Sequence, residues 1–85
     1  MASLKNICES FAGGFLSENA PCIVSIKTSD SSYNNMVPVN AVGHDKNPSD
    51  LMNELSNLIS VDTFNIQVEV YSMYGLIDGS KIPSL

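Results

Sequence analysis

The sequence predicts a small single-domain α+β fold in the order α-β-β-α-β, and three patterns predict it. Residues 64–74 (FNIQVEVYSMY) alternate apolar and polar side chains with the two-residue period of a strand that has one wet face. Residues 4–15 and 48–60 repeat apolar side chains every three or four positions, as amphipathic helices do. Residues 22–28 and 36–43 are apolar segments bounded by turn-forming residues, which is typical of strands.

The first helix is expected to begin after Ser3, a good N-cap residue, and to end near Gly13 and Gly14. Its apolar positions share one helical face: Leu4, Ile7, Cys8, Phe11, Ala12 and Phe15. The glycine pair is interpreted as the helix end. A hinge, or close packing against a partner, is the alternative interpretation.

The first two strands differ in the position that they are expected to take in the sheet. Cys22 to Thr28 is apolar on both faces, which favours a central strand. Met36 to Gly43 contains Pro38, which has no backbone N–H to donate to a neighbour, so this strand is expected at an edge. The connection between the two strands is rich in Ser, Asn and Asp, the residues of turns.

The second helix, Pro48 to Ser60, has a clear start signal. Asn47 suits the N-cap, Pro48 suits the first helical position, and Asp50 brings a negative charge to the first turn. An apolar stripe follows, and its members are expected to cover the sheet: Leu51, Met52, Leu55, Leu58 and Ile59.

The third strand is expected to bury one face and to expose the other. Its inward row is Phe64, Ile66, Val68 and Val70, continued by Ser72 and Tyr74; its outward row is Asn65, Gln67, Glu69, Tyr71 and Met73. Because the proline strand is an edge and antiparallel pairs are the more common, we expect strand order 2-1-3 with both helices on one face. Residues 74–82 are predicted to form a short hairpin, which would add a fourth strand, or else a tail.

Charge excludes several classes of partner. The chain of 85 residues has nine acidic side chains, four lysines, no arginine and a net charge of −5. Proteins that grip phosphates need a basic face, so direct binding to nucleic acid or to an anionic membrane is not expected. The acidic surface either keeps the protein soluble or faces a basic partner.

The two cysteines are expected to be buried, reduced thiols. Cys8 and Cys22 both lie in apolar patterns, and the N-terminal segment does not have the pattern of a signal peptide. No apolar run approaches the roughly 20 residues of a membrane span. We therefore expect a soluble, intracellular (cytoplasmic) protein, with a disulfide between the two thiols as the alternative.

No catalytic, metal-binding or cofactor-binding site is predicted. His44 is the one histidine, and it adjoins Asp45 and Lys46 in a loop, where it could move a proton. However, no nucleophile is expected beside it, and one histidine with two distant cysteines matches no metal spacing. The chain is therefore predicted not to be an enzyme, and His44 is interpreted as a surface residue.

The candidate partner-binding residues are Tyr71, Met73 and Glu69 on the outward face of the third strand, with Tyr33 in the first connection. Tyrosine and methionine are enriched at protein interfaces. A carboxylate beside them favours a basic foreign partner, such as a nucleic-acid-handling protein complex, and an association that salt weakens. The predicted function is an inhibitor or adaptor, and the composition resembles that of small viral and phage accessory proteins. The alternative is a self-assembling structural subunit, for example a homodimer.

Overall fold

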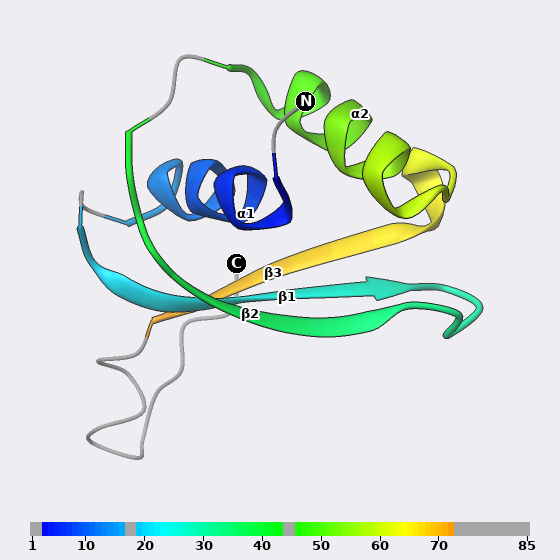
Figure 1. Cartoon of the computed structure of the whole chain (residues 1–85), viewed down its shortest axis with the longest axis horizontal. Helices are drawn as coiled ribbons and strands as arrows, with labels where there is room; N and C mark the ends of the chain where they lie inside the picture. The colour runs from blue at the N-terminus through cyan, green and yellow to red at the C-terminus, as the bar shows by residue number, and fades with distance from the viewer. Residues whose placement is uncertain (1–2, 17–18, 44–45, 73–85) are drawn as a thin grey trace.

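Two helices cover one face of a three-stranded antiparallel sheet in the computed structural model, which describes residues 3–16, 19–43 and 46–72 (Figure 1). The elements in order are α1 (Leu4–Gly13), β1 (Pro21–Thr28), β2 (Asn34–Asn40), α2 (Pro48–Ile59), the 3-10 turn η1 (Thr63–Asn65) and β3 (Ile66–Ser72). The predicted α+β class and element order are confirmed. The fourth strand expected within residues 74–82 lies outside the described residues.

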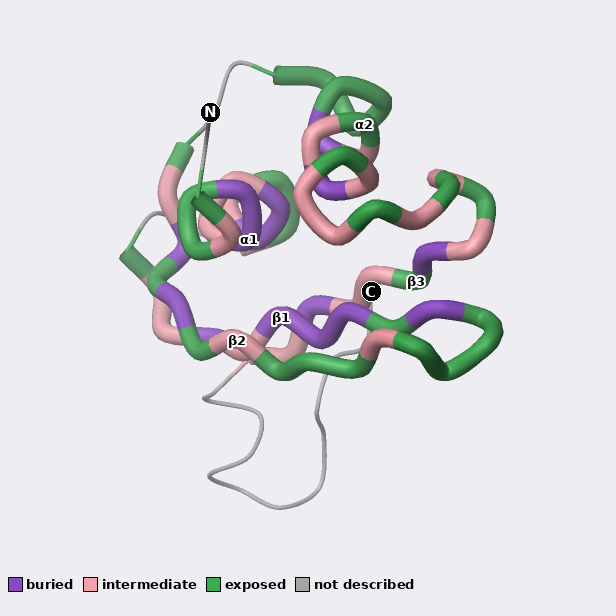
Figure 2. Tube along the Cα trace, turned by 45° about the vertical axis from the view of Figure 1, so that its right-hand side comes forward, coloured by how far each residue is buried: buried purple, intermediate pink, exposed green. Residues whose placement is uncertain are grey.

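The strand order is β2-β1-β3, as predicted, and β1 is antiparallel to both neighbours. At the centre, Val24 of β1 lies opposite Val37 of β2 and Val70 of β3. Figure 2 shows β1 mostly buried and β2 mostly exposed. Pro38 therefore lies in a strand that needs hydrogen-bond donors on one side only, which is the physical reason for its edge position.

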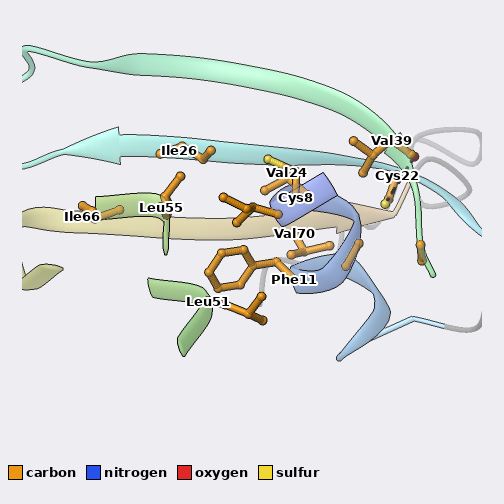
Figure 3. Close-up of a cluster of buried hydrophobic side chains, with 13 residues drawn as sticks. Cys8, Phe11, Cys22, Val24, Ile26, Val39, Leu51, Leu55, Ile66 and Val70 are labelled. Carbon is orange, nitrogen blue, oxygen red and sulfur yellow. Dashed lines mark hydrogen bonds between the residues drawn. The ribbon is translucent and has the colours of Figure 1, made fainter. Parts of the chain in front are cut away.

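The hydrophobic core fills the space between the helices and the sheet (Figure 3). Its buried members come from every main element: Ile7, Cys8, Phe11, Ala12, Cys22, Val24, Ile26, Val39, Ala41, Leu51, Leu55, Ile66 and Val70. Both cysteines are free thiols within this core, as predicted, and do not form the alternative disulfide.

Both helix starts follow the predicted capping. The Ser3 side chain accepts a hydrogen bond from the Asn6 amide at 3.2 Å, and the Asn47 side chain accepts one from the Asp50 amide at 2.9 Å. α2 ends where Ser60 takes the left-handed conformation at φ 59°. These caps satisfy backbone groups that helix ends otherwise leave without partners.

The glycine pair marks the end of α1 and a close approach within the chain. A side-chain Cβ at Gly13 would lie 1.6 Å from the carbonyl oxygen of Val42, so only glycine fits there. The Val42 amide in turn donates to the Glu9 carbonyl at 3.4 Å. The segment that follows β2 therefore passes directly over the end of α1.

The strand predicted at residues 36–43 is displaced in the structure. β2 begins at Asn34 and ends at Asn40, because its pairing with β1 starts immediately after the turn. Beyond β2, Ala41 is paired by loop contacts: its amide donates to the Ala20 carbonyl at 2.8 Å. Ala41 therefore extends the core without extending the sheet.

Two phenylalanines that were expected to be inward are exposed. Phe15 is 58% exposed because α1 stops at Gly13, and the turn beyond it carries Phe15 out of the helical stripe. Phe64 is 82% exposed because it lies in η1, before β3 begins at Ile66. A 3-10 turn does not have the two-residue alternation of a strand, so the predicted inward row is wrong at its first member.

Candidate protein-binding surface

The sheet face that points away from the helices holds three members of the predicted outward row: Gln67, Glu69 and Tyr71. Residues directly opposite one another in antiparallel strands share a face. Three rows across β2, β1 and β3 make up this face: Pro38–Ile23–Tyr71, Met36–Ser25–Glu69 and Asn34–Lys27–Gln67. We call these nine residues the sheet-face surface. It passes from an apolar row at one end to a polar row at the other.

Tyr71 and Glu69 are neighbours on this surface, as the alternation of β3 predicts. The Tyr71 hydroxyl donates a hydrogen bond to Glu69 Oε2 at 2.8 Å. The other carboxylate oxygen, Oε1, lies 4.0 Å from the Lys27 ammonium nitrogen on β1. Because both groups of that ion pair are partly exposed, the pair contributes little to stability. Together with the hydrogen bond, the ion pair fixes where the negative charge of Glu69 lies relative to the Tyr71 ring.

The apolar part of the surface comes from all three strands. Met36 on β2 is 58% exposed, Pro38 is exposed, and Ile23 is half-buried beside Tyr71. Ser25, in the central strand between Met36 and Glu69, is buried. Flexible methionine and half-buried tyrosine are residue types that protein interfaces favour.

Tyr33 does not lie next to Tyr71. Its backbone pairs with Thr28, whose amide donates to the Tyr33 carbonyl at 3.0 Å, at the far end of β1 from Ile23. Five residues of extended strand separate Thr28 from Ile23, a distance of about 17 Å. Tyr33 also packs against the core cluster, and its hydroxyl accepts a hydrogen bond from Asn35 at 3.3 Å. The structure therefore does not bring together all of the residues predicted to bind a partner.

Two sets of sequence predictions lie outside the described residues. Met73 follows the last described residue of β3, and His44 and Asp45 fall in a gap between described segments.

The thiols of Cys8 and Cys22 are described, and they are unsuited to nucleophilic chemistry. Burial, with the neighbouring Cys22 and Glu9 adding to it, raises the pKa of Cys8 to about 12, and burial also raises the pKa of Cys22. A thiolate is the reactive form, so neither group is activated.

Three apolar contributors to the sheet-face surface were not predicted from the sequence: Ile23, Met36 and Pro38. Their signal was present, since each lies at an alternate position in a predicted strand. The sequence did not show the strand register that places these residues beside Tyr71 and Glu69. Register depends on contacts between residues that are far apart in the chain.

Within residues 3–16, 19–43 and 46–72, no group of three or more His, Cys, Asp or Glu side chains is placed to hold a metal ion. Across the same described segments, no helix is long and apolar enough to cross a membrane. Comparisons with protein-family models, with curated proteins and with solved structures find no match. The function is therefore inferred from the geometry of the chain itself.

Proposed function

We propose that the protein is a non-catalytic protein-binding module, an inhibitor or adaptor that docks through the sheet-face surface on a larger protein. The observation that supports this most is the combination of Met36, Tyr71 and Glu69 on one sheet face, on which no described helix packs. A face with apolar and tyrosine side chains beside an oriented carboxylate has the composition of an interface centre and its rim.

Charge indicates the chemistry of the partner. The chain carries a net charge of −5, and the one described lysine on the sheet-face surface, Lys27, lies beside Glu69. A basic protein surface would be attracted over long range, and this attraction raises the rate of association. Protein complexes that handle nucleic acids carry such basic channels, so they are the partner class that we propose.

A homo-oligomeric structural subunit is the second candidate, and the exposed edge of β2 favours it. Asn34, Asn35 and Met36 are exposed on this outer strand, and edge strands can pair with another copy. Pro38 removes one backbone donor from the same edge, and the acidic charge of two identical copies repels. Both features favour a foreign partner over a second copy.

The test compares the full chain with a Met36→Ser/Tyr71→Ser variant and with Asn57→Ser, a control at an exposed position of α2. Each immobilised protein is incubated with cell extract at low salt, and captured proteins are identified and then purified for titration. We expect the immobilised wild type and the Asn57→Ser control to retain a basic protein. The Met36→Ser/Tyr71→Ser variant should bind this protein with about tenfold lower affinity, as expected when central anchors are lost.

Salt provides the second readout of the same experiment. Affinity should fall as ionic strength rises towards about 1 M, where the Debye length is about 3 Å. Light scattering over a range of concentrations should show a monomer. A stable dimer that retains no other protein, and that the double variant dissociates, would instead support the structural subunit.

A further inference from the structure

We propose that a polar hollow at the turn between β1 and β2 binds a small carboxylate that carries several hydroxyl groups, the chemistry shared by acidic sugars and open-chain sugar acids. The hollow has a volume of about 400 Å³. Its lining includes Lys27 and Thr28 of β1, Ser31 and Tyr33 of the connection, Asn34 of β2 and Gln67 of β3. The inference goes beyond the proposed function and does not rest on it, because a small ligand would bind here whether or not a protein docks on the sheet face.

The wall that the turn contributes is held in place without a ligand. The Ser31 amide donates to the Thr28 carbonyl at 3.0 Å, and the Tyr33 amide donates to Thr28 Oγ1, also at 3.0 Å. Ser29, which also lines the hollow, donates to Asn65 twice: its amide to the carbonyl at 2.8 Å, and its hydroxyl to Oδ1 at 3.1 Å. A site that is already ordered loses less conformational entropy when a ligand binds.

Three polar side chains of the lining have hydrogen-bonding capacity to spare. Within the described parts of the chain, the side chains of Ser31, Asn34 and Gln67 make no hydrogen bond. Asn34 and Gln67 lie directly opposite Lys27, one on each side of it, so these three side chains share one face of the sheet. An amide side chain both donates and accepts, and so does each hydroxyl group of a ligand. The hollow therefore matches a ligand with several hydroxyl groups.

Lys27 gives the hollow a positive charge, although the chain as a whole carries −5. Among the described residues that line the hollow, Lys27 is the one with a charge. Its Nζ lies 4.0 Å from Glu69 Oε1, which is too long for a strong hydrogen bond, and an exposed pair of this kind contributes little. The Asp30 carboxylate in the same turn faces Ser32 and Thr28, whose groups donate to it. A ligand carboxylate can therefore form a charge-assisted hydrogen bond with Lys27.

The single cation and the size of the hollow limit the ligand further. Phosphate recognition favours arginine or several cationic donors, and this hollow offers one lysine. Sites for small molecules have volumes of about 300–1,000 Å³, so this hollow is at the lower end of that range. A molecule with one carboxylate and about six carbon atoms is therefore a better match than a nucleotide or a chain of sugars.

The experiment follows the amide chemical shifts of the isotope-labelled full chain while one of four compounds is added at constant pH and ionic strength. Glucuronate is a ring with a carboxylate, gluconate is an open chain with a carboxylate, glucose lacks the charge, and acetate lacks the hydroxyl groups. Each compound is added to the wild type, Lys27→Met, Asn34→Ala/Gln67→Ala and the control Met36→Ser, which lies on the same sheet face outside the hollow. Urea unfolding verifies that each variant is folded.

We expect glucuronate and gluconate to shift the amides of residues 27–34 and 67, with dissociation constants of about 1 mM. The tighter of the two identifies a ring or an open chain as the preferred source of the chemistry. Glucose and acetate should bind about tenfold more weakly, because each lacks one half of the recognised groups.

The variants separate the two halves of the site. Lys27→Met should lower the affinity for both carboxylates about tenfold and leave glucose unchanged, whereas Asn34→Ala/Gln67→Ala should weaken the sugars and leave acetate unchanged. Met36→Ser should change none of these affinities. If Lys27→Met does not fold, Lys27→Gln takes its place with the same expectation. Shifts that do not saturate, shifts centred elsewhere, acetate bound as tightly as gluconate, or gluconate affinity that the Lys27 variant leaves unchanged would overturn the proposal.

Discussion

At the scale of single residues, the two thiols illustrate how packing decides reactivity. Cys8 is fully buried and Cys22 is 1% exposed, and the Cys22 thiol lies 3.6 Å from the Val39 carbonyl oxygen, to which it donates. Because the pKa of Cys8 rises from 9.0 to about 12, its thiolate fraction at neutral pH falls about a thousandfold. We expect both thiols of the folded protein to resist a thiol reagent such as Ellman's reagent.

The reagent should react with both thiols once guanidinium unfolds the protein. An Asn57→Cys variant is the control, because its added thiol lies at an exposed position of α2 and should be labelled in the folded state. Prompt labelling of Cys8 or Cys22 without denaturant would contradict the buried thiols that the structure describes.

Asp30 is the residue whose titration should affect stability. It accepts hydrogen bonds from the Ser32 amide and from the Thr28 hydroxyl, each at 2.9 Å, in the turn between β1 and β2. The bonds from Ser32, with that from Thr28, lower the pKa of Asp30 from 3.8 to about 2. Between these values the unfolded chain binds the proton more readily than the folded one, so stability falls as the pH falls through this window.

Replacement of Asp30 by alanine should remove its part of this dependence. Urea unfolding at a series of pH values should show the wild type losing more stability than Asp30→Ala as the pH falls from 3.8 to about 2. Asp62→Ala is the matched control, since the Asp62 side chain makes no capping hydrogen bond to η1. If the stability of the wild type and that of Asp30→Ala fell in parallel with pH, the hydrogen bonds of the turn would not favour the ionised carboxylate.

At the scale of elements, the end of α1 depends on Gly13. Helix propensity alone predicts that alanine there would stabilise the protein by about 1 kcal/mol. The Val42 carbonyl oxygen occupies the place of the new Cβ, so we expect Gly13→Ala to destabilise by about 1–3 kcal/mol in urea unfolding. Gly14→Ala is the control: Gly14 is exposed at φ −73°, and alanine should be neutral or stabilise slightly. A Gly13→Ala protein as stable as the wild type would contradict this packing.

At the scale of the whole molecule, the sheet-face surface belongs to the strand layer, on the side away from the two helices. It is made by strand register, which sets residues of β2, β1 and β3 side by side. Because the sheet-face surface shares no residue with α2, the Asn57→Ser control should leave binding at the sheet face unchanged, as expected of separate sites.

The sequence by itself determined the element types, their order and much of the core. Apolar periodicity identified β3 and both helices, Pro38 assigned β2 to the edge, and capping residues placed the starts of α1 and α2. These features depend on local conformational preferences and on one-sided burial, and both leave a pattern in neighbouring residues. Tyr71 and Glu69 were paired on one face for the same reason.

Only the tertiary structure decided the ends of the patterns and the composition of the surfaces. Phe15 and Phe64 each fit an apolar repeat, yet Phe15 lies two residues after the end of α1 and Phe64 lies two residues before the start of β3. Where those elements stop depends on the Val42 backbone over α1 and on the Ser29–Asn65 contact beside η1, which join residues far apart in the chain. Local pattern cannot encode such contacts, because loop closure and strand register are settled only when the whole core packs.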